Sequence, residues 1–260
     1  MSPADRIFVG VWNRLTSDWS RLTTFRQMGV LGEDAARDAL YRQNTYFVQQ
    51  RLLNGELRKL LRDPDSFVKD GLAERMPLEM TEAAAKDFRR TLHASTLVFA
   101  HSILDAALYD CVRICAIAAP DDWGDIVGNR KVALAEVATK SYADLLRDHI
   151  EAELDRLERE SLLNKVDRIF QVCRPTKTAY LTNGFRFDRD RLEGLDKLRH
   201  EVVHVPDGDW SMDTIYDDLE FMRRSGLHVF LLVGERFDLC FSGKEAFEAL
   251  AARRRSAEKQ

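Results

Sequence analysis

The sequence predicts an all-α protein, and three observations carry this prediction. The 260 residues are 45% hydrophobic and 32% charged, with only 13 glycines and 6 prolines, so few residues interrupt helices. Apolar residues recur at spacings of three and four along much of the chain, which is the period of a helix with one buried face. No segment alternates convincingly with the period of two that half-buried strands show. The expected architecture is therefore a bundle of antiparallel helices.

Residues 4–62 predict two helical stretches. The segment "MGVLGED" at 28–34 contains two glycines and predicts the break between them, while "RDPDS" at 62–66 predicts the loop after the second. An apolar face on the first stretch is marked by Phe8, Trp12, Leu15, Trp19 and Leu22. We expect residues 1–80 to form an N-terminal helical extension, separate from a bundle over 81–240.

A long helix is expected from residue 81 to residue 118. Its second half is apolar on nearly every side, as in a central buried helix. His101, Asp105 and Tyr109 are polar exceptions, and their spacing of four places them on one ridge. This ridge is either the one exposed stripe of the helix or a face turned towards a functional site.

The rest of the predicted bundle follows an expected loop, "PDDWGDIVGN". Charges at spacings of three and four predict a long helical stretch over 131–173, and "RPTKTAYLTNGFRF" predicts a loop after it. The last helix is expected from about Met212 to beyond Leu232 and includes "HVFLLV". Residues 241–260 are expected to form a C-terminal helix or basic tail.

Between these segments, residues 191–204 predict a shorter helix. Asp190 and Glu193 occupy capping-box positions at its start. Pro206 and Gly208 lie just past its end, where neither residue continues a helix.

Composition restricts the class of protein. Four cysteines in a chain of this length do not indicate a disulfide framework, and Cys111 and Cys115 lie one turn apart in an apolar segment, which predicts buried thiols. The N-terminus has no basic segment followed by an uninterrupted apolar one, and the longest apolar run, "VFLLV" at 229–233, is too short to span a bilayer. We therefore expect a cytoplasmic protein with no membrane partner. The net charge of −4 leaves nucleic-acid binding open.

Two signatures with different chemistry overlap in "LRHEVVHVP" at 198–206. His200, Glu201 and His204 form H-E-x-x-H, the pattern of zinc hydrolases, whereas Arg199 and His204 form R-x-x-x-x-H. The second pattern is short enough to arise by accident, and "RRSGLH" at 223–228 matches it as well.

The zinc interpretation has local support. Two histidines four residues apart point the same way on a helix, with Glu201 available as general base. The continuation disagrees, because Pro206 ends the helix and no third histidine follows on schedule. Glu220 or Asp217 on the next helix would have to supply the third ligand. The zinc hydrolase remains an alternative that the context disfavours.

Helical projection separates the side chains of this helix. One apolar stripe contains Leu195, Leu198, Val202 and Val205. His200 and His204 fall on roughly the opposite face, with Arg199 at its flank. These three side chains are therefore either solvated or placed at a cleft, for instance one formed with a second subunit.

On these residues the sequence resembles the HEPN superfamily, whose helical bundles carry R-x-x-x-x-H on a late helix just before a helix break. "RHEVVHVPDG" matches that layout, with His200 in the polar position that commonly follows the arginine. "FAHSILDAALYDCVRI" is similar to the family's first core helix, with Asp105 as its acidic residue, and "MDTIYDDLEFMRRSGLHVFLL" fits the helix after the motif. The resemblance covers about residues 85–235 and leaves the N-terminal helices unexplained.

The resemblance implies a metal-independent endoribonuclease without a cofactor, active as a homodimer in which two motifs converge on one composite site. Arg199 can hold a phosphate and offset its developing charge. His204 can take a proton from an RNA 2′-hydroxyl or give one to the leaving oxygen, and His200 can do the complementary step. Asp105, His101 and Glu201 are expected to support the site, although Glu201 is also placed to pair with Arg199.

Local charge agrees with an RNA substrate, because residues 165–199 contain nine Lys and Arg against five Asp and Glu. Family analogy alone suggests a toxin or antiviral defence effector with a neutralising partner protein. The competing interpretation is a non-catalytic helical module that binds nucleotides, RNA or protein and dimerises.

Overall fold

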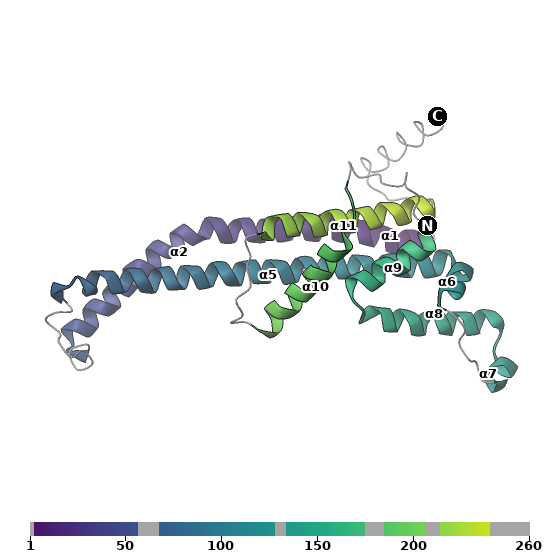
Figure 1. The fold of residues 1–260 in the computed structure, drawn as a ribbon, viewed down its shortest axis with the longest axis horizontal. Helices are drawn as coiled ribbons and strands as arrows, with labels where there is room; N and C mark the ends of the chain where they lie inside the picture. Colours follow the sequence, from purple (N-terminus) through teal and green to yellow (C-terminus); the bar gives the residue numbers. More distant parts are fainter. Residues whose placement is uncertain (1–2, 57–67, 128–133, 175–184, 206–213, 240–260) are drawn as a thin grey trace, which may run out of the picture. The chain divides into compact units, whose positions relative to one another are not determined.

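The computed structural model describes residues 3–56, 68–127, 134–174, 185–205 and 214–239. Every regular element in these ranges is a helix, which confirms the all-α prediction. They are α1 (Pro3–Asn13), the π-helical turn η1 (Arg14–Asp18), α2 (Trp19–Leu53), α5 (Leu72–Ala118), α6 (Pro120–Val127), α7 (Leu134–Thr139), α8 (Tyr142–Glu158), α9 (Leu162–Cys173), α10 (Arg189–His204) and α11 (Ile215–Arg236) (Figure 1).

The chain forms two compact units. One contains Met1–Ser20 together with Leu97–Gln260, and the other contains Arg21–Thr96. The boundaries predicted at residue 80 differ from this division, because the first 20 residues pack with the later helices. The predicted tail at 241–260 lies outside the described residues, as does the predicted loop "RDPDS".

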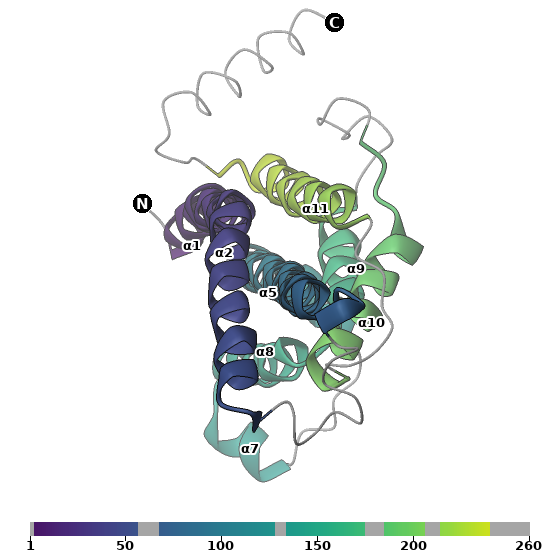
Figure 2. The same cartoon turned by 90° about the vertical axis from the view of Figure 1, so that its left-hand side faces the viewer.

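In the first unit, the part of α5 after Leu97 is central. Figure 2 looks along this helix and shows α1, α8, α9, α10 and α11 arranged around it. Phe8 of α1 stacks on Phe230 of α11 with ring centroids 4.1 Å apart, and both rings are fully buried. Gly234 makes room for this stack, because a Cβ there would lie 2.5 Å from Phe8 Cζ. Tight aromatic packing thus fixes α1 on α11.

In the second unit, α2 and α5 run antiparallel as a hairpin. The predicted break at 28–34 is wrong, since α2 continues through both glycines. Gly29 instead permits close approach of the two helices, because a Cβ there would lie 2.6 Å from Leu92 Cδ2. Asn44 Nδ2 donates to Thr81 Oγ1 at 3.0 Å further along the hairpin. The ion pairs Arg37–Glu82 and Arg89–Glu33 link the same helices.

Several predicted boundaries need correction. The long stretch expected over 131–173 is divided by Ser141 and Ser161, whose hydroxyls cap α8 and α9 and start new helices. Within the expected loop "PDDWGDIVGN", residues 120–127 form α6, because Pro120 fits a first helical position and Asp121 follows it in the first turn. The helix expected from residue 81 already begins at Leu72.

Helix α10 carries the two overlapping signatures. Its cap is Asp188, whose carboxylate accepts from Arg191 N at 3.0 Å, so the predicted capping box is wrong. Glu193 pairs instead with Lys197 at 2.7 Å. The helix ends at His204 as predicted, while Pro206 lies outside the described residues. The prediction that "HVFLLV" belongs to the last helix is confirmed by α11.

The three described cysteines are buried in the first unit. Cys111 and Cys115 are buried free thiols, as predicted, and burial raises the pKa of the Cys111 thiol. Cys173 lies beside them, with its Sγ 3.9 Å from that of Cys115. None of the helices in the described ranges has the length and apolar character needed to cross a bilayer.

Candidate functional site: a polar cavity beside α10

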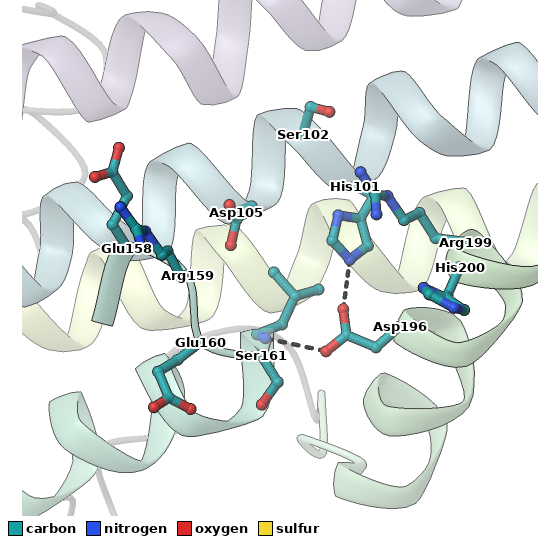
Figure 3. A pocket seen from close by; sticks show the side chains of 11 residues that line it. His101, Ser102, Asp105, Glu158, Arg159, Glu160, Ser161, Asp196, Arg199 and His200 are labelled. Carbon is teal, nitrogen blue, oxygen red and sulfur yellow. Dashed lines mark hydrogen bonds and ion pairs between the residues drawn. The ribbon is translucent and has the colours of Figure 1, made fainter. Parts of the chain in front are cut away.

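A cavity of about 380 Å³ lies in the first unit where α5 and α10 meet the turn between α8 and α9 (Figure 3). Its walls are formed mainly by polar side chains. They are His101, Ser102, Asp105, Glu158, Arg159, Glu160, Ser161, Leu162, Asp196, Arg199 and His200. Four residues that the sequence singled out, His101, Asp105, Arg199 and His200, are thus brought together, and α5 and α10 supply all four.

Asp196 links three elements at the cavity wall. Its Oδ1 lies 2.5 Å from His101 Nε2, and its Oδ2 accepts from the backbone N–H of Leu162 at 3.1 Å (Figure 3). The second contact satisfies an N–H in the first turn of α9, where a carboxylate is favoured by the helix dipole. Since an ionised carboxylate only accepts hydrogen bonds, Nε2 of His101 is the donor.

Lys165 of α9 is the one lysine buried in the described core. Its ammonium donates to Asp105 and, at 3.1 Å, to the carbonyl oxygen of Glu158. The Lys165 side chain is 1% exposed, whereas that of Asp105 is 35% exposed. Asp105 therefore faces the cavity with one oxygen engaged by a buried cation, which keeps the pair compatible with burial.

Arg199 is the unpaired cation of α10. Figure 3 shows its side chain extending from α10 towards α5, on the side of the cavity where His101 lies. Across the described ranges it forms no hydrogen bond or ion pair, and its Nε is buried without a partner. The predicted pairing with Glu201 is not present. A buried guanidinium N–H without an acceptor is costly, so this group is suited to an incoming anion.

His204 lies outside this cavity. Its ring is exposed at the end of α10 and packs against the ring of His200, with centroids 4.4 Å apart. Glu201 is exposed as well. The predicted apolar stripe is only partly buried, because Leu195 and Val202 enter the core while Val205 is 53% exposed. One chain therefore separates Arg199, in the cavity, from His204, on the surface.

The polar ridge of α5 faces the cavity end of the unit. His101 and Asp105 line the cavity, and both are partly buried rather than freely solvated. Tyr109, one turn further on, is also partly buried. Its pKa is raised, first by burial and then by the charge of Glu158. The ridge is therefore not a freely exposed stripe, because two of its three residues line the cavity.

The zinc interpretation and the second R-x-x-x-x-H match have less favourable surroundings than Arg199. Glu220, a proposed third zinc ligand, is held by Arg223 at 2.7 Å, and this arginine lowers its pKa. Within the described ranges no group of three or more His, Cys, Asp or Glu is arranged to hold a metal ion. The second R-x-x-x-x-H match is divided too, since Arg223 bonds Glu220 and His228 is buried in the core.

Sequence reasoning missed Asp196, Lys165 and Arg159. Asp196 precedes Arg199 by three residues and His200 by four, so helical projection places all three on one face. This spacing could have identified Asp196 from the sequence. The burial of Lys165 could not be predicted from its neighbours in the sequence, because its partner Asp105 lies on a different helix.

Comparison with protein-family models, curated proteins and solved structures finds no significant match to this chain. Function is therefore argued from the site itself.

Proposed function

We propose that this protein is a metal-independent endoribonuclease that cleaves RNA by attack of a 2′-hydroxyl on the adjacent phosphate. Arg199 is the observation that carries the proposal, because it lines a polar cavity with its Nε buried and unpartnered. A guanidinium so placed binds a phosphate oxygen and offsets the charge that develops during the reaction.

The pairing of the charged groups around the cavity supports an anionic ligand. Three of its four carboxylates are already engaged: Asp105 with Lys165, Asp196 with His101, and Glu160 with Arg156 at 2.5 Å. Arg159 and Arg199 form no ion pair with any described residue. Two guanidinium groups are therefore available to a ligand, whereas Glu158 is the one carboxylate of the described cavity wall that no other side chain engages.

The exposed position of His204 supports a composite site. RNA cleavage needs two proton transfers near the phosphate, and His204, the histidine of the motif, lies outside the cavity that Arg199 of the same chain lines. In a homodimer, His204 of one copy completes the cavity of the other. His200, which touches both the cavity and His204, orients the phosphate or transfers the second proton.

The products would be a 2′,3′-cyclic phosphate and a 5′-hydroxyl. This chemistry restricts the enzyme to RNA, because DNA lacks the attacking hydroxyl. The resemblance to HEPN bundles supports the same assignment and extends it to a cytoplasmic toxin or defence effector, held in check by a neutralising partner protein.

The test is incubation of purified protein with mixed RNA in the presence of a chelator. Cleavage is expected to survive chelation and to fall about 10²–10³-fold in Arg199→Ala. In His204→Ala the expected loss is about 10²–10⁴-fold. Arg223→Ala is the matched control, because it removes the arginine of the same pattern on α11 and should keep full activity. Activity lost on chelation would instead indicate the zinc hydrolase.

The composite site has its own test. Mixing inactive Arg199→Ala and His204→Ala proteins should restore part of the activity, since a mixed dimer contains one cavity with an intact arginine and a histidine from the other copy. Failure to complement, in a sample shown to be dimeric, would place both groups in one chain.

The second candidate is a non-catalytic interaction module, which the exposed apolar residues of α2 favour. Met28, Leu31 and Leu53 are more than two-thirds exposed, and Met28 and Leu31 lie one turn apart, so α2 presents apolar side chains that another protein can cover. Absence of cleavage in every condition, with binding of RNA or protein retained, would support this function.

A further inference from the structure

We infer that His101 is a second catalytic histidine, acting from within the same cavity as Arg199, and that Asp196 is its positioning residue. This inference rests on the proposed ribonuclease function. Cleavage by 2′-hydroxyl attack needs two proton transfers, one from the attacking hydroxyl and one to the leaving oxygen. The R-x-x-x-x-H motif supplies one histidine per chain for them.

The geometry of the His101–Asp196 pair is that of an oriented base. Asp196 Oδ1 accepts from Nε2 at 2.5 Å, so the neutral imidazole carries its proton on Nε2 and its lone pair on Nδ1. Nδ1 forms no hydrogen bond with any described residue. The ring is partly buried at the cavity wall, where Arg199 also lies (Figure 3). A carboxylate–imidazole pair beside an unpaired guanidinium places a base next to a phosphate-binding group.

Asp196 is itself held in place. Its second oxygen accepts from the Leu162 N–H at the start of α9, so the carboxylate is fixed by α9 while it holds the histidine of α5. Three helices thus determine the direction of the imidazole ring. Preorganisation of this kind is expected where a side chain transfers a proton.

The proposed step moves one proton to His101 and one proton from His204. His101 Nδ1 takes the proton of the 2′-hydroxyl while that oxygen bonds to phosphorus. The bond from phosphorus to the 5′-oxygen breaks, and this oxygen takes a proton from the imidazolium of His204. Arg199 binds a non-bridging oxygen of the phosphate throughout. His101 returns its proton, and His204 regains one, through water in the next cycle.

The charged groups that face His101 come from all the neighbouring elements. They are Asp105 of α5, Glu158, Arg159 and Glu160 at the α8–α9 turn, and Asp196, Arg199 and His200 of α10. Among them only His200 belongs to a residue type that titrates near neutrality. The pH profile must therefore be measured in both wild-type and His200→Asn backgrounds.

The experiment is a pH–rate profile of RNA cleavage by the full chain. His101→Ala is expected to lower the rate about 10²–10³-fold and to remove the acidic limb of the profile in both backgrounds. Added imidazole should restore part of the rate, because the cavity then holds a free base. An unchanged rate and profile, or a loss that imidazole does not rescue, would make His101 structural and overturn the inference.

Asp196→Asn separates positioning from helix capping. An asparagine carbonyl still accepts from Leu162 N–H, so α9 keeps its cap. If its amide faces His101, Nε2 can no longer donate and the ring changes tautomer, so the rate should fall about 10²-fold or more with no change in thermal stability. A stability loss equal to that of Asp196→Ala, without a rate effect, would show capping only.

The two proposals fail differently. If His101→Ala is fully active while Arg199→Ala and His204→Ala are inactive, the ribonuclease stands and His101 is not its base. If the wild-type protein cleaves no RNA, both proposals fail.

Discussion

Phe8 of the first compact unit is fully buried, whereas Phe25 of the second is 45% exposed. The contrast extends to their neighbours. In the first unit, several helices surround α5 and bury the stacked rings of Phe8 and Phe230. The second unit is a hairpin of two helices, and its described apolar core is little more than Leu22, Val48, Ala85 and Leu92. The polar cavity belongs to the first unit. Precise placement of polar groups thus occurs where apolar packing is deepest, as expected if a rigid scaffold holds them.

The largest expected effect separates the two phenylalanines. Phe8→Ala should lower the free energy of unfolding by about 3–5 kcal/mol, because it opens a cavity beside Phe230 that the surrounding helices cannot fill. Phe25→Ala should lower it by less than about 1 kcal/mol, since its ring keeps much of its contact with water. Urea denaturation followed by circular dichroism measures both, and equal losses would contradict the contrast in packing.

Ion pairs of the two units should differ in the same direction. Asp105→Ala leaves the ammonium of Lys165 buried without its carboxylate and should cost about 3 kcal/mol. Glu82→Ala removes an exposed pair with Arg37 in the hairpin and should cost less than about 1 kcal/mol.

Lys165→Met is the control for the buried pair. It leaves Asp105, which is partly exposed and retains water, so its cost should be smaller than that of Asp105→Ala. If Lys165→Met costs more than Asp105→Ala in the same denaturation experiment, the carboxylate of Asp105 is the charge that needs its partner, which contradicts this prediction.

These two units also show where sequence reasoning succeeds. The all-α class, the extent of α10 and the buried cysteines followed from periodicity and local signals, which depend on nearest neighbours along the helix. The predicted break at 28–34 was wrong, because Gly29 in this segment is explained by its contact with Leu92, a residue 63 positions away. Asp188 displaced the predicted capping box for a similar reason, since cap geometry depends on where the chain enters the helix.

The candidate site was predicted in its residue types but not in its arrangement. His101 and Asp105 were placed on one ridge, and Arg199 and His200 on one helix, yet nothing local states that the two helices enclose a cavity with the α8–α9 turn. The separation of His204 from Arg199 also depends on the neighbouring elements. The cavity that Arg199 lines, and His204 does not, is formed by α5 and the α8–α9 turn together with α10.

Acidification should weaken the first unit through His228. Burial lowers the pKa of this histidine below its ordinary value of 6.5, so the folded state favours the neutral ring. Its contribution is complete above pH 6.5, and stability falls as the pH drops from 6.5 towards the lowered folded pKa, because the unfolded chain then binds the extra proton. The slope from this one group is at most about 1.4 kcal/mol per pH unit.

His228→Phe tests this assignment by thermal unfolding between pH 7 and pH 5. The variant should show a shallower decline than the wild type, whatever its stability at pH 7. The hairpin offers a comparison in His93, which is less buried and whose pKa is lowered first by burial and then by Arg89 and Arg26. His93→Phe should change the slope in the same direction, and an unchanged slope would contradict a lowered pKa for His93 in the folded state.

A contrast within the second unit concerns two glycines three residues apart on α2. Nothing lies within 4 Å of a Cβ added to Gly32, so Gly32→Ala should raise the free energy of unfolding by about 0.5–1 kcal/mol through helix propensity. Gly29→Ala gains the same propensity but places Cβ against the buried side chain of Leu92, and the crowding should cost about 1–3 kcal/mol. If both substitutions stabilise equally, Leu92 moves freely and the hairpin has no tight point of contact. If they differ in sign, even the loosely packed unit contains one position at which the approach of two helices, and not the intrinsic preference of the chain, determines the residue.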